Sequence, residues 1–197
     1  MEELVIATTN KGKVKEFKSL LSPQINNILS INDFDNIPEI DETGSSFEEN
    51  ALIKARTVAS ITGKITISDD SGLEVEALSG EPGIYSARYA GDAASDSENI
   101  EKLLEELFRI NDRAARFVCC IALVDNKGNE HTFTGTCEGE ILTSTRGEGG
   151  FGYDPVFYYP DAGKTFAELS LDEKNKYSHR AKAINKLNEY LSTLKKS

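Results

Sequence analysis

The sequence predicts an α/β protein, in which strands and helices alternate along the chain. Residues 4–7 form a short apolar run that is followed, after a small polar loop, by apolar residues at helical spacing. Residues 65–67, Ile-Thr-Ile, are β-branched, which favours a strand. Residues 117–124 are almost continuously apolar, as in a strand that is buried on both faces.

Composition restricts the classes of partner. The 197 residues are most economically one domain, residues 1–197, which is long enough to bury a core. A hydrophobic content of 39% and a charged content of 28% are typical of a soluble globular protein. The formal net charge of −11 argues against nucleic acid or an anionic membrane as a general partner, so an anionic substrate must meet a local cluster of cations. No apolar run approaches the length of a membrane span.

The cysteines and the first residues predict a cytoplasmic protein. There are three cysteines, and Cys119 and Cys120 are adjacent, which predicts neither a disulfide framework nor a zinc site. We expect all three to be reduced thiols. Residues 1–7 are acidic and then apolar, and they lead directly into a strand pattern, so we expect no signal peptide.

A phosphate site is predicted where the first strand meets the first helix. The segment consists of small polar residues, a glycine and two lysines: Thr8, Thr9, Asn10, Lys11, Gly12 and Lys13. The N–H groups of a first helical turn and the helix dipole favour phosphate, and Lys13 adds a point charge. The spacing is not that of a Walker A loop. A capped turn with solvated lysines is the alternative.

A second helix is predicted to begin at one of two serines. Ser45 with Glu48, and Ser46 with Glu49, both match the capping box. Glu49 therefore has two interpretations, a cap or a carboxylate of a catalytic site. Glu42 precedes the helix on a loop, where a carboxylate is free to bind a cation.

Two adjacent carboxylates follow the β-branched strand. Asp69, Asp70, Ser71 and Gly72 are turn formers, and we expect them to end the strand abruptly. Because neighbouring side chains of a strand point to different sides, at least one carboxylate can face a binding site as a metal ligand or general base. A plain acidic turn is the alternative.

The middle of the chain alternates between loops and regular elements. Residues 28–40 are expected to be irregular and residues 73–78 extended. Ser95 with Glu98 forms a third capping box, and residues 125–129 predict the turn of a β-hairpin.

A glycine-rich loop is predicted to approach a ligand closely. Residues 147–155 contain four glycines, and Phe151 and Tyr153 within them offer aromatic stacking faces beside Asp154. A flexible surface loop is the alternative.

Charged residues gather at the start of the last helical region. Ser170 and Glu173 form a capping box, and Lys174, His179 and Arg180 lie at or before the start of the last helix. Because His179 and Arg180 are adjacent, they can bracket a planar ligand or a phosphate.

Six segments together resemble one known family, the inosine triphosphate pyrophosphatases, also called XTP/dITP diphosphatases. The matching segments run through almost the whole chain: residues 8–13, residues 42–44 with 47–51, residues 68–73, residues 82–89, residues 149–155 and residues 178–180. We find no departure from the family pattern at a position expected to do chemistry.

The resemblance implies an elongated mixed β-sheet flanked by helices, with two lobes and a central substrate cleft, and a homodimer. It also implies an activity: hydrolysis of ITP, dITP and XTP between the α and β phosphates, giving monophosphate and pyrophosphate. The cofactor it implies is Mg²⁺.

The resemblance also assigns roles to residues. Asp70 resembles the base that activates water, Glu42 and Asp70 resemble the carboxylates that hold Mg²⁺, and Asp69 and Glu49 are weaker candidates. The residues that resemble the triphosphate grip are Thr8, Thr9, Asn10, Lys11, Gly12, Lys13 and Lys174. Those that resemble the nucleotide and base-binding set are Ser71, Phe151, Gly152, Tyr153, Asp154, His179 and Arg180.

Two other functions compete with this one. A related pyrophosphatase of the septum-formation inhibitor type would act on modified pyrimidine or methylated nucleotides. The Phe-Gly-Tyr-Asp segment at residues 151–154 and the Ser-His-Arg segment at residues 178–180 favour the purine enzyme. A regulator that senses nucleotide without hydrolysis would need the grip but not the carboxylates at positions 42, 69 and 70.

Overall fold

The computed structural model describes residues 3–21, 25 and 27–194. The strands in these residues are β1 (Glu3–Ile6), β2 (Asn27–Ser30), β3 (Thr66–Val75), β4 (Ala114–Val124), β5 (Glu130–Ile141), β6 (Phe157–Tyr159) and β7 (Lys164–Thr165). The α-helices in the same residues are α1 (Lys11–Leu20), α2 (Phe47–Thr62), α3 (Asp96–Glu106), α4 (Leu171–Tyr177) and α5 (His179–Leu194). The N-terminal strand and loop, the capped helices and the β-hairpin turn are thereby confirmed.

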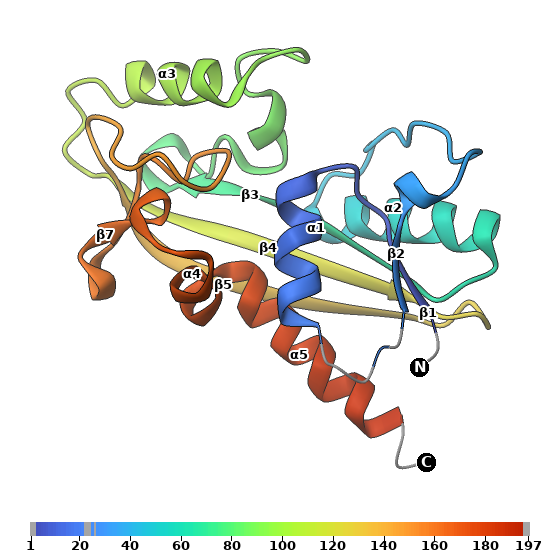
Figure 1. The fold of residues 1–197 in the computed structure, drawn as a ribbon. Coiled ribbons are helices and arrows are strands. Elements are labelled where there is room, and N and C mark those ends of the chain that lie inside the picture. Colours follow the sequence, from blue (N-terminus) through green and yellow to red (C-terminus); the bar gives the residue numbers. More distant parts are fainter. Residues whose placement is uncertain (1–2, 22–24, 26, 195–197) are drawn as a thin grey trace. The chain divides into compact units, whose positions relative to one another are not determined.

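Within the described residues, the strands form one mixed seven-stranded sheet in the order β2-β1-β3-β4-β5-β6-β7 (Figure 1). Strand β1 pairs in parallel with β2 and β3, whereas β6 pairs antiparallel with β5 and β7. A mixed sheet flanked by helices agrees with the predicted α/β class.

Three expectations about elements were wrong. Strand β3 runs without a break through the turn formers at residues 69–72, and it ends only at Val75. Residues 28–40 were expected to be irregular, but residues 28–30 belong to β2, a short strand at the end of the sheet that carries no long apolar run. Residues 76–78, expected to be extended, form a short 3₁₀ helix, because the chain makes a tight turn in which the N–H of Ser79 donates to the carbonyl of Glu76.

The chain folds into two compact units, which we describe separately. Unit 1 comprises Met1–Asp70, Cys119–Gly135 and Arg180–Ser197. Unit 2 comprises Ser71–Val118 and Thr136–His179. Strands β3, β4 and β5 contribute residues to both units.

In unit 1, helices cover both faces of the sheet (Figure 1). On one face, Phe17 of α1 and Ile184 of α5 pack with Ile67 of β3. On the other face, Ala51 and Ala55 of α2 pack against β4. Because side chains alternate along a strand, the face of each β3 residue follows from its position.

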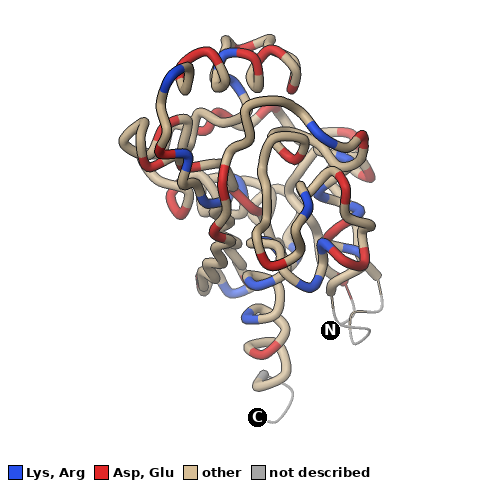
Figure 2. The backbone as a smooth tube through the Cα atoms, turned by 90° about the vertical axis from the view of Figure 1, so that its left-hand side faces the viewer, with Lys and Arg blue, Asp and Glu red and all other residues tan. Residues whose placement is uncertain are grey.

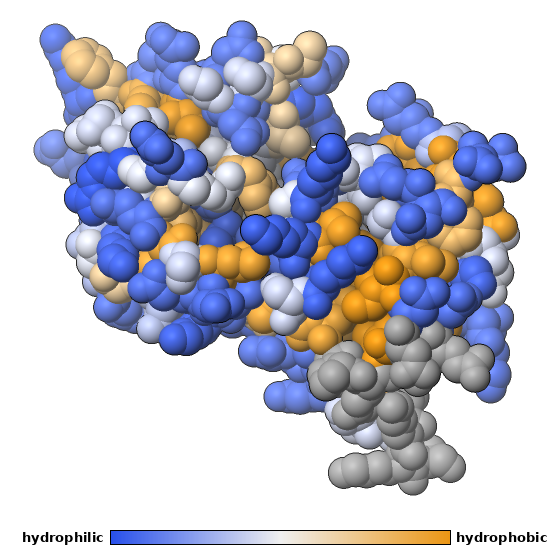
Figure 3. Space-filling view, in the orientation of Figure 1, coloured by the Kyte–Doolittle hydropathy of each residue, from blue (hydrophilic) through white to orange (hydrophobic). Residues whose placement is uncertain are grey.

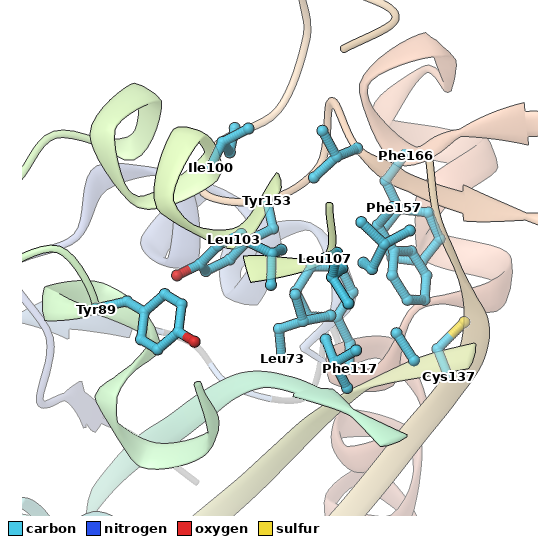
Figure 4. Packing of buried hydrophobic residues seen from close by; sticks show 14 residues of the cluster. Leu73, Tyr89, Ile100, Leu103, Leu107, Phe117, Cys137, Tyr153, Phe157 and Phe166 are labelled. Carbon is cyan, nitrogen blue, oxygen red and sulfur yellow. The ribbon is translucent and has the colours of Figure 1, made fainter. Parts of the chain in front are cut away.

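In unit 2, one hydrophobic cluster joins α3 to β3, β4, β5 and β6 (Figure 4). Aromatic rings form its centre: Phe117 lies 4.4 Å from Phe157 and 5.7 Å from Phe166 between ring centroids. Leu103 of α3 and Leu107, the C-cap of this helix, are fully buried in the same cluster. This core fixes the elements that carry the glycine-rich loop.

Acidic and basic residues are interspersed along the backbone, so the excess negative charge is not confined to one segment (Figure 2). On the face shown in Figure 3, hydrophilic side chains predominate, with hydrophobic patches between them. Among the described helices, none combines the length and apolar character needed to cross a membrane. The three cysteines are free thiols and all are buried.

Candidate active site

The two adjacent carboxylates of β3 contact different helices of unit 1. Asp69 lies on the same face as Ile67, toward α1 and α5, and Asp70 lies on the same face as Ser68, toward α2. The hydroxyl of Ser68 donates to the carbonyl of Ala51 in α2, which ties this point of the strand to the helix. The prediction that neighbouring carboxylates point to different sides is confirmed.

Asp69 is a buried anchor for two cations. Its Oδ2 atom lies 3.0 Å from Lys13 Nζ and 3.1 Å from Arg180 Nη2. Arg180 is itself fully buried, and its Nη1 atom donates to Glu16 of α1. Burial alone raises the pKa of Asp69, but the charges of Lys13 and Arg180 outweigh it and lower the pKa well below its ordinary value. Asp69 is therefore a stable anion.

Asp70 lies beside a second group of polar residues. Its Oδ2 atom accepts a hydrogen bond of 3.1 Å from Asn50 Nδ2, and its Oδ1 atom lies 3.7 Å from Lys54 Nζ. Burial and the negative charge of Glu42 raise the pKa of Asp70, and the positive charge of Lys54 lowers it. The net result is a pKa above the ordinary value. A carboxylate with a raised pKa is a stronger proton acceptor, as a general base requires.

Glu42 joins the same group. Its Oε1 atom lies 2.5 Å from Lys54 Nζ, so one ammonium contacts both Glu42 and Asp70. Burial alone lowers the pKa of Lys54, but the charges of Asp70 and Glu42 outweigh it and raise the pKa above its ordinary value. The position between the two carboxylates is therefore one that favours a cation.

These residues fit a divalent cation. No cluster of three or more His, Cys, Asp or Glu suited to a metal ion occurs among the residues that the structure describes. Mg²⁺ commonly uses only one or two carboxylates and completes its shell with water and substrate phosphates. The Oδ1 atom of Asp69 is buried, and within the described part of the chain it has no hydrogen-bond partner. Glu42 and Asp70 therefore offer oxygen ligands of the kind that a divalent cation prefers, whereas Asp69 points to the other face of β3.

Glu49, the other candidate carboxylate, is engaged in the helix cap. Ser46 is the N-cap of α2, and its side chain accepts from the N–H of Glu49. The carboxylate of Glu49 accepts from the N–H and the hydroxyl of Ser45 at 2.6 and 2.8 Å. Glu49 is thus engaged at the start of α2, but it does not close the predicted capping box, because its carboxylate binds Ser45 and not the N–H of Ser46.

The predicted phosphate loop lies at the N-terminus of α1. Asn10 is the N-cap and accepts from the N–H of Lys13, and Thr8 accepts from the N–H of Asn10. Thr9 and Lys11 are exposed, and Gly12 is half-buried in the first helical turn. The first N–H groups of a helix have no partner within the helix, so this turn presents donors suited to an anion.

In unit 2, the glycine-rich loop is folded around Asp154. Asp154 Oδ2 accepts from the N–H of Phe151 at 3.0 Å and from Lys174 Nζ at 2.6 Å. A Cβ atom on Gly150 would lie 2.0 Å from the same oxygen, and Gly150 has a φ of +76°. Only glycine fits this close approach. The N–H of Gly149 also donates to the carbonyl of Ala167 at 3.1 Å, which ties this exposed part of the loop to unit 2.

The remaining predicted residues of unit 2 lie in or near its core. Lys174 Nζ lies 4.8 Å from the centroid of the Phe151 ring, which groups Lys174 with the base-binding candidates. The Tyr153 ring is buried in the hydrophobic cluster and its hydroxyl donates to the carbonyl of Ser86, so Tyr153 does not offer a free stacking face. The His179 ring stacks on Phe117 at 4.7 Å. Gly152 and Ser71 are half-buried, and the N–H of Gly152 donates to Asp96.

Comparison with known proteins identifies the family of this chain. A model of the Ham1 family matches residues 4–190. The chain belongs to the Ham1 family. The protein named dITP/XTP pyrophosphatase of Bacillus licheniformis is 52% identical over 97% of this chain and 98% of its own length.

Solved Ham1 structures share the fold. The Ham1 protein of Staphylococcus aureus is 48% identical, with a TM-score of 0.88, over 98% of this chain and 99% of its own. A Ham1 protein from Coxiella burnetii is 43% identical, with a TM-score of 0.89, over 98% of this chain and 100% of its own. The resemblance seen in the sequence motifs is thus confirmed over nearly the whole length.

In this Ham1 chain, the sequence alone assigned no role to three residues that contact the charged residues of unit 1. Lys54 and Asn50 are four residues apart on α2, so they share the helix face toward β3. Glu16 is buried three residues after Lys13 on α1 and binds Arg180. The i, i+3 spacing to Lys13 was a signal that would have found Glu16, whereas Asn50 and Lys54 have no such spacing to a candidate residue on α2.

Proposed function

We propose that this chain is a nucleoside triphosphate pyrophosphatase that hydrolyses ITP, dITP and XTP to the monophosphate and pyrophosphate. The observation that carries the proposal is that Asp69 and Asp70 point to opposite faces of β3. Asp69 binds two cationic side chains, and Asp70 lies near Lys54, which also contacts Glu42. The names of relatives at about half identity over nearly the full chain support the same reaction.

Asp70 serves as the base that takes a proton from the attacking water. The amide of Asn50, 3.1 Å from its Oδ2 atom, holds the carboxylate in one orientation, and a bound cation would keep it ionised, as a base requires. Glu42 and Asp70 hold a divalent cation, which we propose is Mg²⁺. When bound, Mg²⁺ supplies positive charge that neutralises the phosphates and the developing charge of the transition state.

The α1 N-terminus binds the phosphates of the substrate. Residues 8–13 present helix N–H groups, and Lys13 adds a point charge whose position is fixed by Asp69 at 3.0 Å. Asp69 is therefore a positioning residue and not a ligand of the reacting atoms.

Unit 2 recognises the base. The Phe151 ring offers a stacking face, and its loop is held by Asp154 and Lys174. A donor directed at the 6-keto oxygen of the purine selects against adenine, because the 6-amino group leaves that donor unpaired at a cost of about 1–3 kcal/mol.

A homodimer, which the family resemblance implies, and a cytoplasmic location, which the three free cysteines favour, complete the proposal.

The test is turnover of ITP, dITP, XTP, GTP and ATP, each with and without Mg²⁺. We expect Mg²⁺-dependent release of pyrophosphate from the first three and little from GTP and ATP.

Asp70→Asn should abolish turnover and retain nucleotide binding, whereas the matched control Asp125→Asn, in the exposed hairpin turn, should behave as wild type. Unchanged turnover in Asp70→Asn removes this residue from the mechanism. Binding without turnover in the wild type supports the sensor instead.

A further inference from the structure

Lys54 occupies a position in unit 1 that the proposed mechanism does not explain. It lies on α2, one turn after Asn50, and its side chain is only 12% exposed. Its ammonium lies 2.5 Å from Glu42 Oε1 and 3.7 Å from Asp70 Oδ1. Lys54 thus contacts the same two carboxylates that are proposed to hold the divalent cation.

An ammonium and a divalent cation cannot occupy that position together. Mg²⁺ binds carboxylate oxygens at about 2.0–2.1 Å, so it needs the lone pairs of Glu42 and Asp70 directed at itself. Two cations on one oxygen also repel each other strongly in a partly buried site. While its ammonium stays at Glu42, Lys54 therefore opposes the binding of a divalent cation to these oxygens.

We infer that Lys54 is a resident counter-ion that competes with the divalent cation for Glu42 and Asp70, so that the cation enters with the nucleoside triphosphate and not before it. This inference rests on the proposed function. The four-carbon stem of Lys54 is flexible enough for the ammonium to swing away, and triphosphate oxygens can accept it. The free enzyme then keeps its two carboxylates compensated, and the metal site forms only when substrate is present.

The experiment measures Mn²⁺ binding to the nucleotide-free protein from the electron paramagnetic resonance signal of free Mn²⁺. We expect Lys54→Met to bind Mn²⁺ at least tenfold more tightly than wild type. Arg56→Met is the matched control: it lies on the same helix, changes the net charge equally, and releases only exposed Glu130, at 2.6 Å. Its Mn²⁺ affinity should equal that of wild type. Adding Glu42→Gln to Lys54→Met should reverse the gain.

A second measurement needs no variant. Wild type should bind Mn²⁺ at least tenfold more tightly when a non-hydrolysable α,β-methylene analogue of ITP is present. Tight Mn²⁺ binding to the wild type without the analogue overturns the inference, as does an equal affinity in Lys54→Met or an equal gain in Arg56→Met. Because no readout requires turnover, failure to hydrolyse ITP with the Mn²⁺ results intact would reject the proposed function alone.

Discussion

Replacing Asp69 with asparagine tests the buried charge group of unit 1. Asp69 is 1% exposed and compensates Arg180, also 1% exposed, at 3.1 Å. Removing one partner of a buried ion pair leaves the other uncompensated and costs about 3–5 kcal/mol. We expect a value near the lower end, about 3 kcal/mol, because Glu16 still binds Arg180 and the asparagine carbonyl can still accept one hydrogen bond.

The assay is thermal and urea unfolding followed by circular dichroism. For a chain of this length, about 3 kcal/mol corresponds to a loss of roughly 6–12 °C in Tm. Glu74→Gln is the control, because Glu74 pairs with Arg116 at 2.6 Å on the surface, where such a pair contributes about 0–1 kcal/mol. A Tm of Asp69→Asn within about 2 °C of wild type would refute the reasoning.

The pH dependence of this loss has a defined sign. The pKa of Asp69 in the folded protein is lowered by Lys13 and Arg180 despite its burial. Its stabilisation is therefore complete above its unfolded pKa, about 3.9, and is lost as the pH falls through the lower folded value. The difference in stability between wild type and Asp69→Asn should be constant near neutral pH and narrow only in strong acid. A difference that narrows already between neutral pH and pH 5 would contradict this pKa direction.

Three further substitutions test other parts of the account. Gly150→Ala places a Cβ atom 2.0 Å from Asp154 Oδ2 at a residue whose φ is +76°. The value of kcat/KM for ITP should therefore fall at least tenfold, and an unchanged value would show that the loop adapts to the added methyl group. Lys13→Ala should raise KM for ITP about tenfold or more through loss of a charged phosphate contact, and an unchanged KM in steady-state kinetics would limit Lys13 to its ion pair with Asp69. Ser46→Ala removes the N-cap side chain of α2 and should lower the free energy of unfolding by about 1 kcal/mol in urea titrations. An unchanged free energy of unfolding would mean that another group caps the helix.

Local patterns predicted much of the fold, because the relevant interactions lie within a few residues. The capping boxes at Ser95 and Ser170 form as expected, and Asn10 caps α1 directly after the first strand. The buried run at residues 117–124 lies within β4. In each case the donors and acceptors are close in sequence, so the pattern alone contains them.

The continuity of β3 could not be predicted in the same way. The turn formers at residues 69–72 favour a strand end by local preference. Asp69, however, binds Arg180, which is 111 residues away, and Asp70 binds Asn50, which is 20 residues away. These distant partners satisfy the carboxylates inside the sheet, so tertiary contacts override the local preference. The same limit concealed the contact between Lys54 and the carboxylates.

The measurement that tests the central claim most directly is the identity of the products formed from ITP in the presence of Mg²⁺. Phosphorus nuclear magnetic resonance should show inosine monophosphate and pyrophosphate in equal amounts, with ¹⁸O from labelled water only in the monophosphate when attack occurs at the α phosphorus. Release of orthophosphate with inosine diphosphate would place the cleavage at the terminal phosphate and contradict the account.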